Sequence, residues 1–355
     1  MPEFHDGLIG KNVFEAVHPT ESHRLAVRKA VIFRAMKFWT RTIRVVAAIA
    51  LFFCAWQVNG QAGSNTDQSS GAYRLQLSVD EVILTFHATD VHGLPINDLT
   101  LGEIKLFDKG IAPRRIVAFD SLIDRPVRAG ILLDTSESMQ QTLPESKTIA
   151  ERYAQRLFRQ RSDQAFVMDF GYSSEIAQSF TSDPSLLEQS IRNVKQGRMN
   201  PLGGTAIFDT IFRACFYGFS KVDATATGNF ILLISDGQDN SSHTSLEEAL
   251  GACQRSNTVI YAFRVEPDPG RSSTGPKLLA DLASKTGGRV FPADDTEDAI
   301  WRDLKTIESE MRNQYRLVYN PANLRHDGSF HEIELQPPDR VGRIEVRSGY
   351  YAPAH

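Results

Sequence analysis

Alternating apolar and polar positions mark the first ordered part of the chain as β structure. Residues 75–89 favour an extended conformation, and a turn is expected at residues 92–95. Residues 104–107 and 116–119 predict two further short strands. Segment 74–124 is therefore predicted to be a small β unit, which needs partner strands because so few short strands cannot bury a face alone.

From Val127 onward, apolar strands alternate with amphipathic helices. The predicted strands cover residues 129–133, 165–170, 230–234, 259–263 and 289–291. The last helix is predicted to begin at Asp295 or Thr296, and its apolar stripe consists of Ile300, Leu304, Ile307 and Met311. This alternation is typical of a doubly wound, mostly parallel α/β sheet with helices on both faces. We assign residues 127–312 to such a Rossmann-like domain.

The chain returns to β structure after this domain. Strands are predicted at residues 315–319, 330–335 and 343–347, within a C-terminal β segment of residues 313–353. Because two small β segments flank the α/β domain, we expect their strands to pair in one accessory sheet or sandwich.

An apolar stretch near the N-terminus, residues 45–58, is too short for a membrane-spanning helix, which needs ~20 residues. It has the flanks of a secretory signal, namely the basic residues Lys37, Arg41 and Arg44 before it and the small residues Gly60 and Ala62 after it. We therefore expect a signal peptide at residues 36–60 that starts from Met36. An uncleaved anchor with a short cytoplasmic tail is the alternative.

This interpretation places the rest of the chain outside the cytoplasm. Residues 1–35 would be a mis-assigned start or the cytoplasmic tail of the anchor, and residues 61–73 a flexible polar leader. The protein would be secreted, periplasmic or at the cell surface. It would meet a membrane only through the N-terminal segment.

The charge of the chain argues against two classes of partner. The formal net charge of the 355 residues is -4. The first 60 residues hold eight Lys/Arg and four Asp/Glu, so the remainder carries a net charge of -8. Such a surface has no electrostatic attraction for nucleic acid or for an anionic membrane.

Two cysteines lie beyond the N-terminal segment, Cys215 and Cys253, both in predicted helices. Export would allow them to form a disulfide, and two buried free thiols are an equally good interpretation. The sequence leaves both possibilities open.

Oxygen-bearing side chains gather at the ends of predicted elements of the α/β domain. They are Asp134, Ser136 and Ser138 after its first strand, Thr205 before a helix, and Asp236 after the strand at residues 230–234. Ligand sites of open α/β sheets lie at the carboxyl ends of the strands. We therefore expect these five side chains to converge.

This arrangement resembles the metal-ion-dependent adhesion site of von Willebrand factor type A domains, with three motifs in the same order over about residues 127–312. Flanking motifs are similar to those of a bacterial subfamily of type A proteins known from acidobacterial genomes. They are Leu-Thr at 99–100, Leu-Phe-Asp-Lys-Gly at 106–110, Asp-Gly-Gln-Asp-Asn-Ser-Ser at 236–242, Tyr-Arg-Leu-Val-Tyr at 315–319 and Gly-Tyr at 349–350. The resemblance implies a secreted or periplasmic type A protein.

The resemblance also implies a bound divalent cation. Ser136 and Ser138 would contact the metal directly, and Thr205, Asp134 and Asp236 would do so directly or through water. Oxygen ligands without sulfur or imidazole select Mg²⁺, Mn²⁺ or Ca²⁺ over zinc or copper. An Asp or Glu carboxylate of a protein partner would complete the coordination of the ion.

These residues also have plainer structural explanations. Asp134 and Ser136 could cap the following helix, and Asp236 could open a turn. Three neighbouring acids are expected to lie outside the ligand set: Glu137 facing solvent, Asp209 starting a helix or supporting the site, and Asp239 in a surface loop.

The sequence carries no recognisable catalytic motif. A Gly-x-Ser-x-Gly elbow and a His-Glu-x-x-His motif are lacking, and the nine histidines are scattered. Residues 270–277 superficially resemble a phosphate loop, but Pro276 takes the place of the lysine, so we interpret them as a surface loop before a helix. We expect a binding module rather than an enzyme. A scaffold stabilised by its metal is the first alternative, and a metallohydrolase the second.

Overall fold

The computed structural model describes residues 81–197, 203–219, 228–266, 274–293 and 296–353, which belong to one compact unit. The predicted signal peptide and leader, residues 36–73, lie outside the described residues. No helix within the described ranges is both long enough and apolar enough to cross a membrane.

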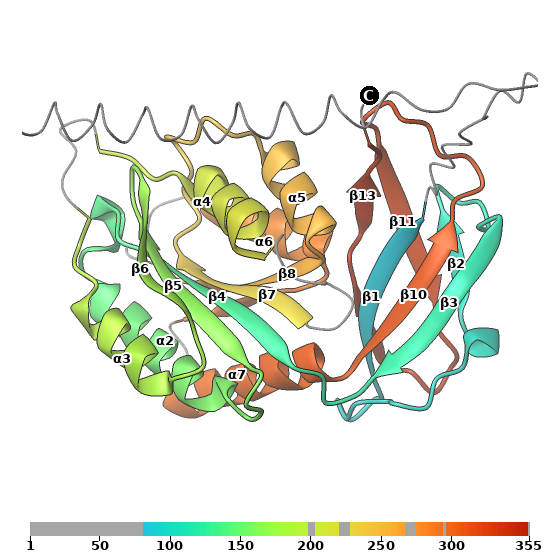
Figure 1. Ribbon diagram of the computed structural model, residues 1–355, viewed down its shortest axis with the longest axis horizontal. Coiled ribbons are helices and arrows are strands. Elements are labelled where there is room, and N and C mark those ends of the chain that lie inside the picture. Colours follow the sequence, from blue (N-terminus) through green and yellow to red (C-terminus); the bar gives the residue numbers. More distant parts are fainter. Residues whose placement is uncertain (1–80, 198–202, 220–227, 267–273, 294–295, 354–355) are drawn as a thin grey trace, which may run out of the picture. The chain divides into compact units, whose positions relative to one another are not determined.

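A six-stranded sheet forms the centre of the α/β part (Figure 1), in the order β6-β5-β4-β7-β8-β9. Its strands are β4 (Val127–Asp134), β5 (Gln164–Phe170), β6 (Ser174–Thr181), β7 (Gly228–Ser235), β8 (Thr258–Arg264) and β9 (Val290–Pro292). Every neighbouring pair is parallel except β5 and β6. The predicted doubly wound, mostly parallel α/β fold is confirmed.

The burial of each strand explains whether its apolar pattern was visible in the sequence. All eight residues of β4 and of β7 are buried, because helices cover both faces of the sheet there. The edge strand β6 has no fully buried residue. Its sequence therefore lacks an apolar signature, and β6 is not among the predicted strands.

Helices cover both faces of the sheet. They are α2 (Leu143–Leu157), α3 (Pro184–Asn193), α4 (Ile207–Arg213), α5 (Leu246–Arg255), α6 (Gly275–Thr286) and α7 (Glu297–Arg312), with short helical segments η1 (Leu101–Glu103), η2 (Glu137–Met139) and the π-helical η3 (Ala214–Phe219). Figure 1 shows α2, α3 and α7 on one face and α4, α5 and α6 on the other. A separate buried apolar cluster fills each interface. Of the two predicted starts of the last helix, Thr296 is the cap, because its side chain accepts a hydrogen bond from the Ala299 amide.

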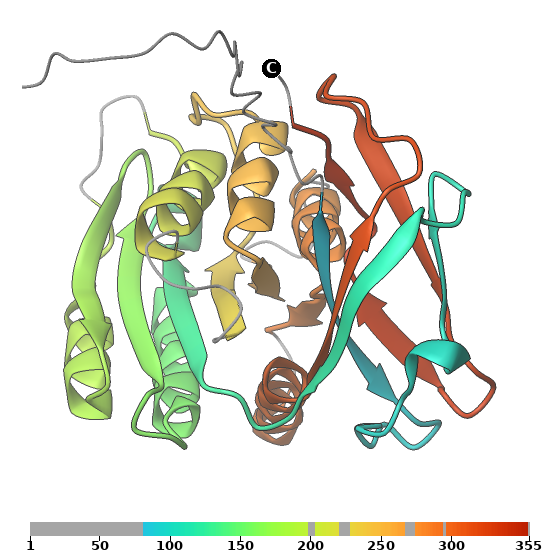
Figure 2. The ribbon, with the colours of Figure 1, turned by 45° about the vertical axis from the view of Figure 1, so that its right-hand side comes forward.

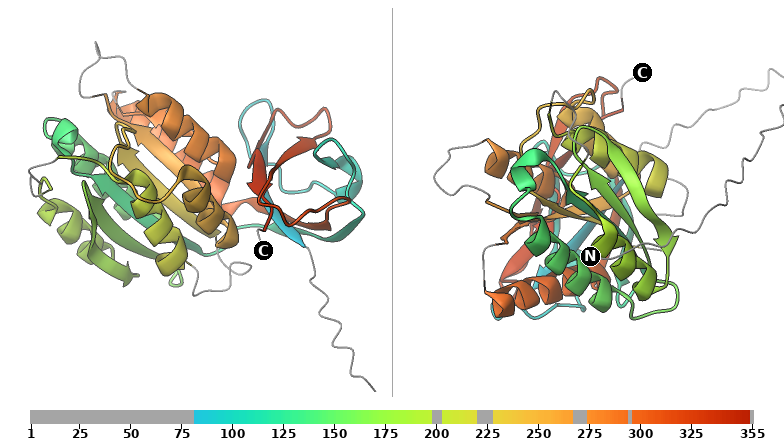
Figure 3. Two further views of the ribbon diagram at one scale, coloured as in Figure 1. Left: turned by 90° about the horizontal axis from the view of Figure 1, so that it is seen from above. Right: turned by 90° about the vertical axis from the view of Figure 1, so that its left-hand side faces the viewer.

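Strands from the two flanking β segments lie side by side (Figures 2 and 3). They are β1 (Val82–Thr89), β2 (Lys105–Asp108) and β3 (Arg115–Leu122) from the first segment, and β10 (Gln314–Asn320), β11 (Phe330–Gln336), β12 (Arg343–Val346) and β13 (Gly349–Tyr351) from the second. The four-stranded sheet has the order β12-β1-β10-β3, and the three-stranded sheet the order β13-β11-β2. Each sheet contains strands from both segments, and all of the pairings are antiparallel.

The expectation of one accessory sheet is therefore wrong, and the sandwich alternative describes the observed arrangement. Leu84 and Phe86 of the four-stranded sheet share a buried cluster with Leu106 and Ile333 of the three-stranded sheet. Two facing sheets bury apolar side chains that a single sheet would leave against water.

A polar cluster inside this sandwich joins strands that are remote in sequence. Asp108 accepts hydrogen bonds from the hydroxyls of Tyr319 at 2.9 Å and Tyr350 at 2.8 Å, and the Nδ1 atom of His331 lies 2.7 Å from the same carboxylate. All four residues are buried. The cluster links β2, β10, β11 and β13, so it ties both sheets together.

A buried ion pair within the α/β part lies next to its junction with the sandwich. Arg312, the last residue of α7, contacts Asp163 at 2.8 Å and donates a second hydrogen bond to the carbonyl of Leu157. Only Asn313 separates α7 from β10, the sandwich strand that pairs with β1. Arg312 therefore fixes the end of α7 to the α/β part, directly before the chain enters the sandwich strand β10.

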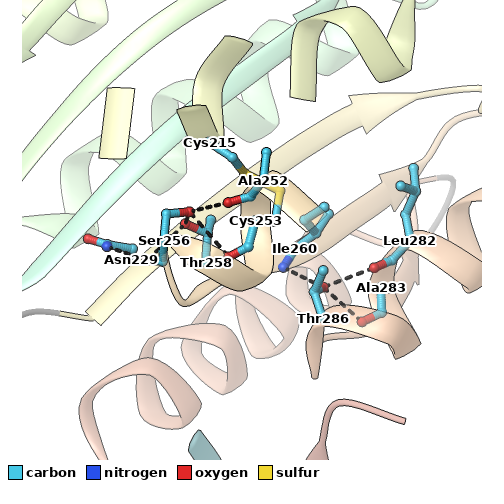
Figure 4. The surroundings of a disulfide bond; sticks show 10 residues. All are labelled: Cys215, Asn229, Ala252, Cys253, Ser256, Thr258, Ile260, Leu282, Ala283 and Thr286. Carbon is cyan, nitrogen blue, oxygen red and sulfur yellow. Dashed lines mark hydrogen bonds between the residues drawn. A yellow bond between two sulfur atoms is a disulfide. The ribbon is translucent and has the colours of Figure 1, made fainter. Parts of the chain in front are cut away.

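Cys215 and Cys253 form a disulfide, which decides between the two possibilities left by the sequence. Both residues are fully buried, and the bond joins η3 to α5 (Figure 4). Because η3 continues α4, the disulfide ties together the two helices that follow the Thr205 and Asp236 loops.

Candidate metal centre

The first candidate loop begins at Asp134, the last residue of β4. Its fully buried carboxylate accepts a hydrogen bond from the Ser136 amide at 2.9 Å. The hydroxyls of Ser136 and Ser138 lie 3.2 Å apart, with Ser138 on the exposed side. Glu137 is also exposed, as expected. The structure thus brings together the three predicted donors of this loop.

The third loop follows β7, the strand beside β4, and carries Asp236. The preceding residue, Ser235, donates its hydroxyl to Asp134 Oδ2 at 2.6 Å and accepts a hydrogen bond from the Gly237 amide at 2.9 Å. The Asp236 carboxylate is buried and accepts hydrogen bonds from the amide and side chain of Gln238. Ser235 is not among the predicted site residues, although its place at a strand end directly before Asp236 was a signal for it.

The second loop carries Thr205 and is held by the third. The Thr205 amide donates to Asn240 Oδ1 at 2.8 Å, and its carbonyl accepts hydrogen bonds from the amides of Asn240 and Ser241. Gly204 precedes it with a φ of +122°, and a Cβ atom there would lie 1.9 Å from Ser241 Oγ. Glycine is therefore favoured at this position, because the positive φ is strained for other residues and an added Cβ atom would displace the Ser241 side chain.

The first and second loops meet at Gly171, just after β5. A Cβ atom at Gly171 would lie 3.7 Å from Ser136 Cα and 3.8 Å from the carbonyl oxygen of Gly204. The Gly171 carbonyl also accepts a hydrogen bond from the Ala206 amide at 2.8 Å. Each pair of the three candidate loops is therefore joined by hydrogen bonds or close packing.

Two neighbouring acids, Asp239 and Asp209, stabilise the loops by accepting hydrogen bonds. Asp239 accepts hydrogen bonds from the Phe208 amide at 3.0 Å and from the Ser242 hydroxyl at 2.6 Å. Asp209, in the first turn of α4, accepts a hydrogen bond from the Thr244 amide at 2.7 Å. Asp239 is half-buried and stabilises the start of α4, a role beyond that expected of a surface-loop acid.

The third loop also packs tightly on the start of α6. A Cβ atom at Gly275 would lie 2.1 Å from the Asp236 carbonyl oxygen, and one at Gly237, whose φ is +78°, would lie 2.5 Å from the Gly275 carbonyl oxygen. The interpretation of residues 270–277 as a surface loop is therefore wrong from Gly275 onward, because Gly275 is buried and begins α6. Residues 270–273 lie outside the described part of the chain.

The electrostatics of the site favour a cation. Burial raises the pKa of Asp134 to about 6, and repulsion from Asp236 adds to this, although hydrogen bonds from Ser136 and Ser235 oppose it. Among the described residues, no Lys, Arg or His forms an ion pair with either aspartate. Two neighbouring buried carboxylates without a counter-ion create a site that a positive ion would stabilise.

The available donors suit a hard divalent cation. Across the described chain, no cluster of three or more His, Cys, Asp or Glu side chains could hold a metal, and the candidate donors of this site are two carboxylates and three hydroxyls. The Ser136 hydroxyl lies 3.2 Å from that of Ser138 and also interacts with the Asp134 carboxylate, and the Thr205 hydroxyl has no hydrogen bond within the described residues. These hydroxyls remain able to turn toward an ion.

The comparisons with individual proteins cover between 40% and 53% of this chain. Over 145 residues the chain is 26% identical to calcium-activated chloride channel regulator 1 of Bos taurus, a match that spans 40% of this chain and 14% of the length of that relative. The conserved hypothetical protein BatB of Bacteroides thetaiotaomicron is similar in structure at 20% identity and a TM-score of 0.42, over 51% of this chain and 97% of BatB.

A structure of proximal thread matrix protein 1 from the mussel byssus, with a zinc-occupied MIDAS motif, is similar at 14% identity and a TM-score of 0.42. That match covers 53% of this chain and 48% of the mussel protein. The von Willebrand factor type A domain family model matches residues 130–309, which is half of the chain. The chain therefore belongs to the von Willebrand factor type A domain family.

Proposed function

We propose that this chain is an extracytoplasmic binding module that captures a protein partner through a divalent cation. Asp134, Ser136, Ser138, Thr205 and Asp236 would hold the ion. When bound, the cation would supply a coordination position for an Asp or Glu carboxylate of the partner. The chain's own groups would position the donors and keep water away from the buried side of the site.

One observation carries this proposal: Asp134 is fully buried beside Asp236, and no cationic side chain of the described chain neutralises them. Leaving charged carboxylates buried and unpaired is costly. A bound divalent ion would remove this cost. The two carboxylates formally balance a divalent ion and the neutral hydroxyls add no charge, so a further carboxylate could occupy a remaining position in its coordination shell.

The donor chemistry favours Mg²⁺, Mn²⁺ or Ca²⁺. Carboxylate and hydroxyl oxygens are hard ligands, and the site contains no thiolate or imidazole donor among the described residues. Because Cys215 and Cys253 form a disulfide, neither has a thiol that could bind a metal.

A purely structural metal is a weaker explanation of the site. The Ser235–Asp134 hydrogen bond already joins the first and third loops, and Asn240 joins the third to Thr205. The loops thus have direct links that do not need an ion. Catalysis is also disfavoured, because the histidine of the third loop, His243, is largely exposed and bonds to Asp209.

A location outside the cytoplasm is supported by the disulfide, since such bonds persist mainly in oxidising compartments. It agrees with the signal peptide expected at residues 36–60. The apolar and basic pattern of that segment remains the sequence argument for export.

Calorimetric titration of Mg²⁺ and Mn²⁺ into the full chain tests the site. The wild type should bind one ion saturably, and the double variant Asp134→Ala/Asp236→Ala should not. Glu137→Gln is the matched control, because it removes an exposed carboxylate from the same loop and should bind the ion as the wild type does. Equal binding by all three proteins, or by none, would contradict the proposal.

A peptide-binding experiment distinguishes a metal that captures a partner from a metal that only stabilises the fold. We would probe the full chain with an array of acetylated heptapeptides that contain a single Asp, Glu or Asn, in Mg²⁺ or in EDTA. A binding module should retain Asp or Glu peptides in Mg²⁺ only. A protein that gains thermal stability from Mg²⁺ but retains no peptide in either condition would be a scaffold with a structural metal.

A further inference from the structure

A groove of about 790 Å³ opens beside the candidate metal loop. It extends from Ser136 and Glu137 over the turn between β5 and β6 to the end of α3. We call it the β6–α3 groove; its lining includes Ser136, Glu137, Asp169, Tyr172, Glu175 and Lys195. Its volume falls in the range of about 300–1,000 Å³ that is typical of ligand pockets.

Two carboxylates face each other in this groove. Asp169 of β5 and Glu175 of β6 are directly opposed across the antiparallel strand pair, so their side chains lie on the same face of the sheet. Neither carboxylate forms an ion pair within the described chain. Burial, together with repulsion from Glu175, raises the pKa of Asp169. Like charges opposed in this way destabilise a sheet unless a cation lies between them.

Within the described residues, the other charged side chains of the groove do not neutralise this pair. Glu137 adds a third carboxylate at the end next to the metal loop, and Lys195 is exposed and makes no ion pair with the described residues. The described lining of the groove is thus acidic, and it is continuous with a site proposed to attract a carboxylate. A partner complementary to both must carry a positive and a negative group close together.

We propose that the β6–α3 groove receives a Lys or Arg side chain from the same partner segment whose carboxylate binds the candidate cation. This inference rests on the proposed function and specifies its partner: an exposed protein segment that carries an acidic residue and, a few residues away, a basic one. The like-charged Asp169 and Glu175 recognise the basic group, and the metal loop recognises the acidic group.

The shape of the groove favours a side chain over a second metal ion. A metal would need several oxygen ligands around a small space, whereas this groove is wide and its opposed pair supplies only two carboxylates. An Arg guanidinium can donate to both carboxylates at once, and its stem can lie against Tyr172, which is 44% exposed. A second ion is treated as a competing outcome of the test.

The test uses acetylated heptapeptides with one fixed Asp and with Arg, Gln or Glu at each other position in turn. Binding to the full chain in Mg²⁺ is measured for the wild type, Asp169→Asn/Glu175→Gln and Asp134→Ala/Asp236→Ala. The matched control is Asp339→Asn/Glu247→Gln, which removes two exposed carboxylates from other elements. All variants are first compared by thermal unfolding.

The expected result is that Arg at one or two positions improves wild-type binding roughly tenfold over Gln. Asp169→Asn/Glu175→Gln should lose this preference while still binding the Asp peptides in a Mg²⁺-dependent way, and the control should keep it. Mg²⁺-dependent binding with no preference for Arg, or with a preference that survives in Asp169→Asn/Glu175→Gln, would overturn the groove inference and leave the proposed function standing.

Two further outcomes are distinguishable. If no peptide binds in a Mg²⁺-dependent way, the proposed function fails and the groove inference fails with it. If calorimetry finds a second Mg²⁺ or Ca²⁺ ion that Asp169→Asn/Glu175→Gln loses, the groove is a second metal site, which also overturns the inference.

Discussion

The hydroxyl of Ser235 donates a 2.6 Å hydrogen bond to Asp134 Oδ2, and this contact joins the carboxyl ends of β7 and β4. The other oxygen of the same carboxylate accepts the Ser136 amide. Both oxygens of Asp134 are thereby oriented by the chain itself. Such a preformed arrangement lowers the cost of organising the donors when an ion binds.

Replacing Ser235 by alanine should weaken cation binding more than it weakens folding. Loss of a group that orients a metal ligand typically costs about 10–100-fold in affinity. Ser256→Ala is the control, because Ser256 is also buried and hydrogen-bonded but lies at the end of α5, outside the three loops. Calorimetric titration of Mg²⁺ should show the loss for Ser235→Ala only. Equal affinity in both variants would contradict the role given to Ser235.

The stabilisation by Mg²⁺ should depend on pH. Burial raises the pKa of Asp134 to about 6. In EDTA, the contribution of Asp134 to stability is then fully present below the ordinary carboxyl pKa near 4 and is lost as the pH rises through about 6. Mg²⁺ binds the ionised form and offsets that loss, so it should raise the melting temperature more at pH 7 than at pH 5. Asp134→Asn should abolish the Mg²⁺ effect at both values, and an equal effect at both in the wild type would refute the prediction.

The buried pair between Asp163 and Arg312 predicts a second pH effect, of opposite sign. Burial alone would raise the pKa of Asp163, but the hydrogen bond from Arg312 and those from main-chain amides, among them that of Val127, hold it below the usual range. Its stabilising contribution is therefore present above about pH 4 and is lost as the pH falls further. Asp163→Asn would leave the Arg312 charge unpaired and should cost about 3–5 kcal/mol at pH 7.

Urea unfolding of wild type and Asp163→Asn between pH 3 and 7 measures this effect. The two curves should converge at the acidic end, because the wild-type carboxylate is then also protonated. Arg340, whose ion pair with Asp98 is exposed, offers a control. Asp98→Asn should leave the free energy of unfolding nearly unchanged, because water screens an exposed ion pair.

Removal of the disulfide should destabilise the α/β part. The bond closes a separation of 38 residues, for which the chain-entropy estimate is about 4 kcal/mol. Cys215→Ala/Cys253→Ala should therefore unfold at lower urea concentration than the oxidised wild type, and dithiothreitol should affect only the wild type. A wild type whose unfolding midpoint is the same with and without dithiothreitol would argue that the bond does not form in solution.

Glu175→Gln should increase stability slightly. The change removes one member of the like-charged pair with Asp169, and cross-strand charge pairs contribute about 0.2–1 kcal/mol. Urea unfolding at low salt should show the gain, and added salt should reduce it because screening weakens the repulsion in the wild type. A loss of stability would mean that Glu175 has an attractive partner in the folded chain.

Local apolar patterns predicted much of the α/β core. The stripe from Ile300 to Met311 located α7 correctly, because an amphipathic helix buries one continuous face. Strands β4 and β7 were evident because all of their residues are buried. In contrast, α3 and β6 were not predicted; β6 is an edge strand, and exposed residues leave no periodic apolar signal.

The candidate site was only partly visible in the sequence. Oxygen donors directly after predicted strands were recognisable, since parallel strands end at one edge of the sheet. The position of Ser235 was a signal, but its bond to Asp134 and the roles of Asn240 and Gly275 were not recognisable, because each acts through a contact with another loop or helix. Such contacts depend on which strands are neighbours, and the order of strands in a sheet is not encoded in any single segment.

By itself, the sequence determined most of the local elements, the family resemblance and the chemical types of the candidate donors. Only the tertiary structure decided that Asp108 meets Tyr319 and Tyr350 between two sheets, and that Cys215 pairs with Cys253. The physical reason is the range of the interactions. Helix and strand propensities and burial patterns act over a few residues, whereas these contacts join segments that lie far apart in the chain and meet only after the sheets and helices have packed.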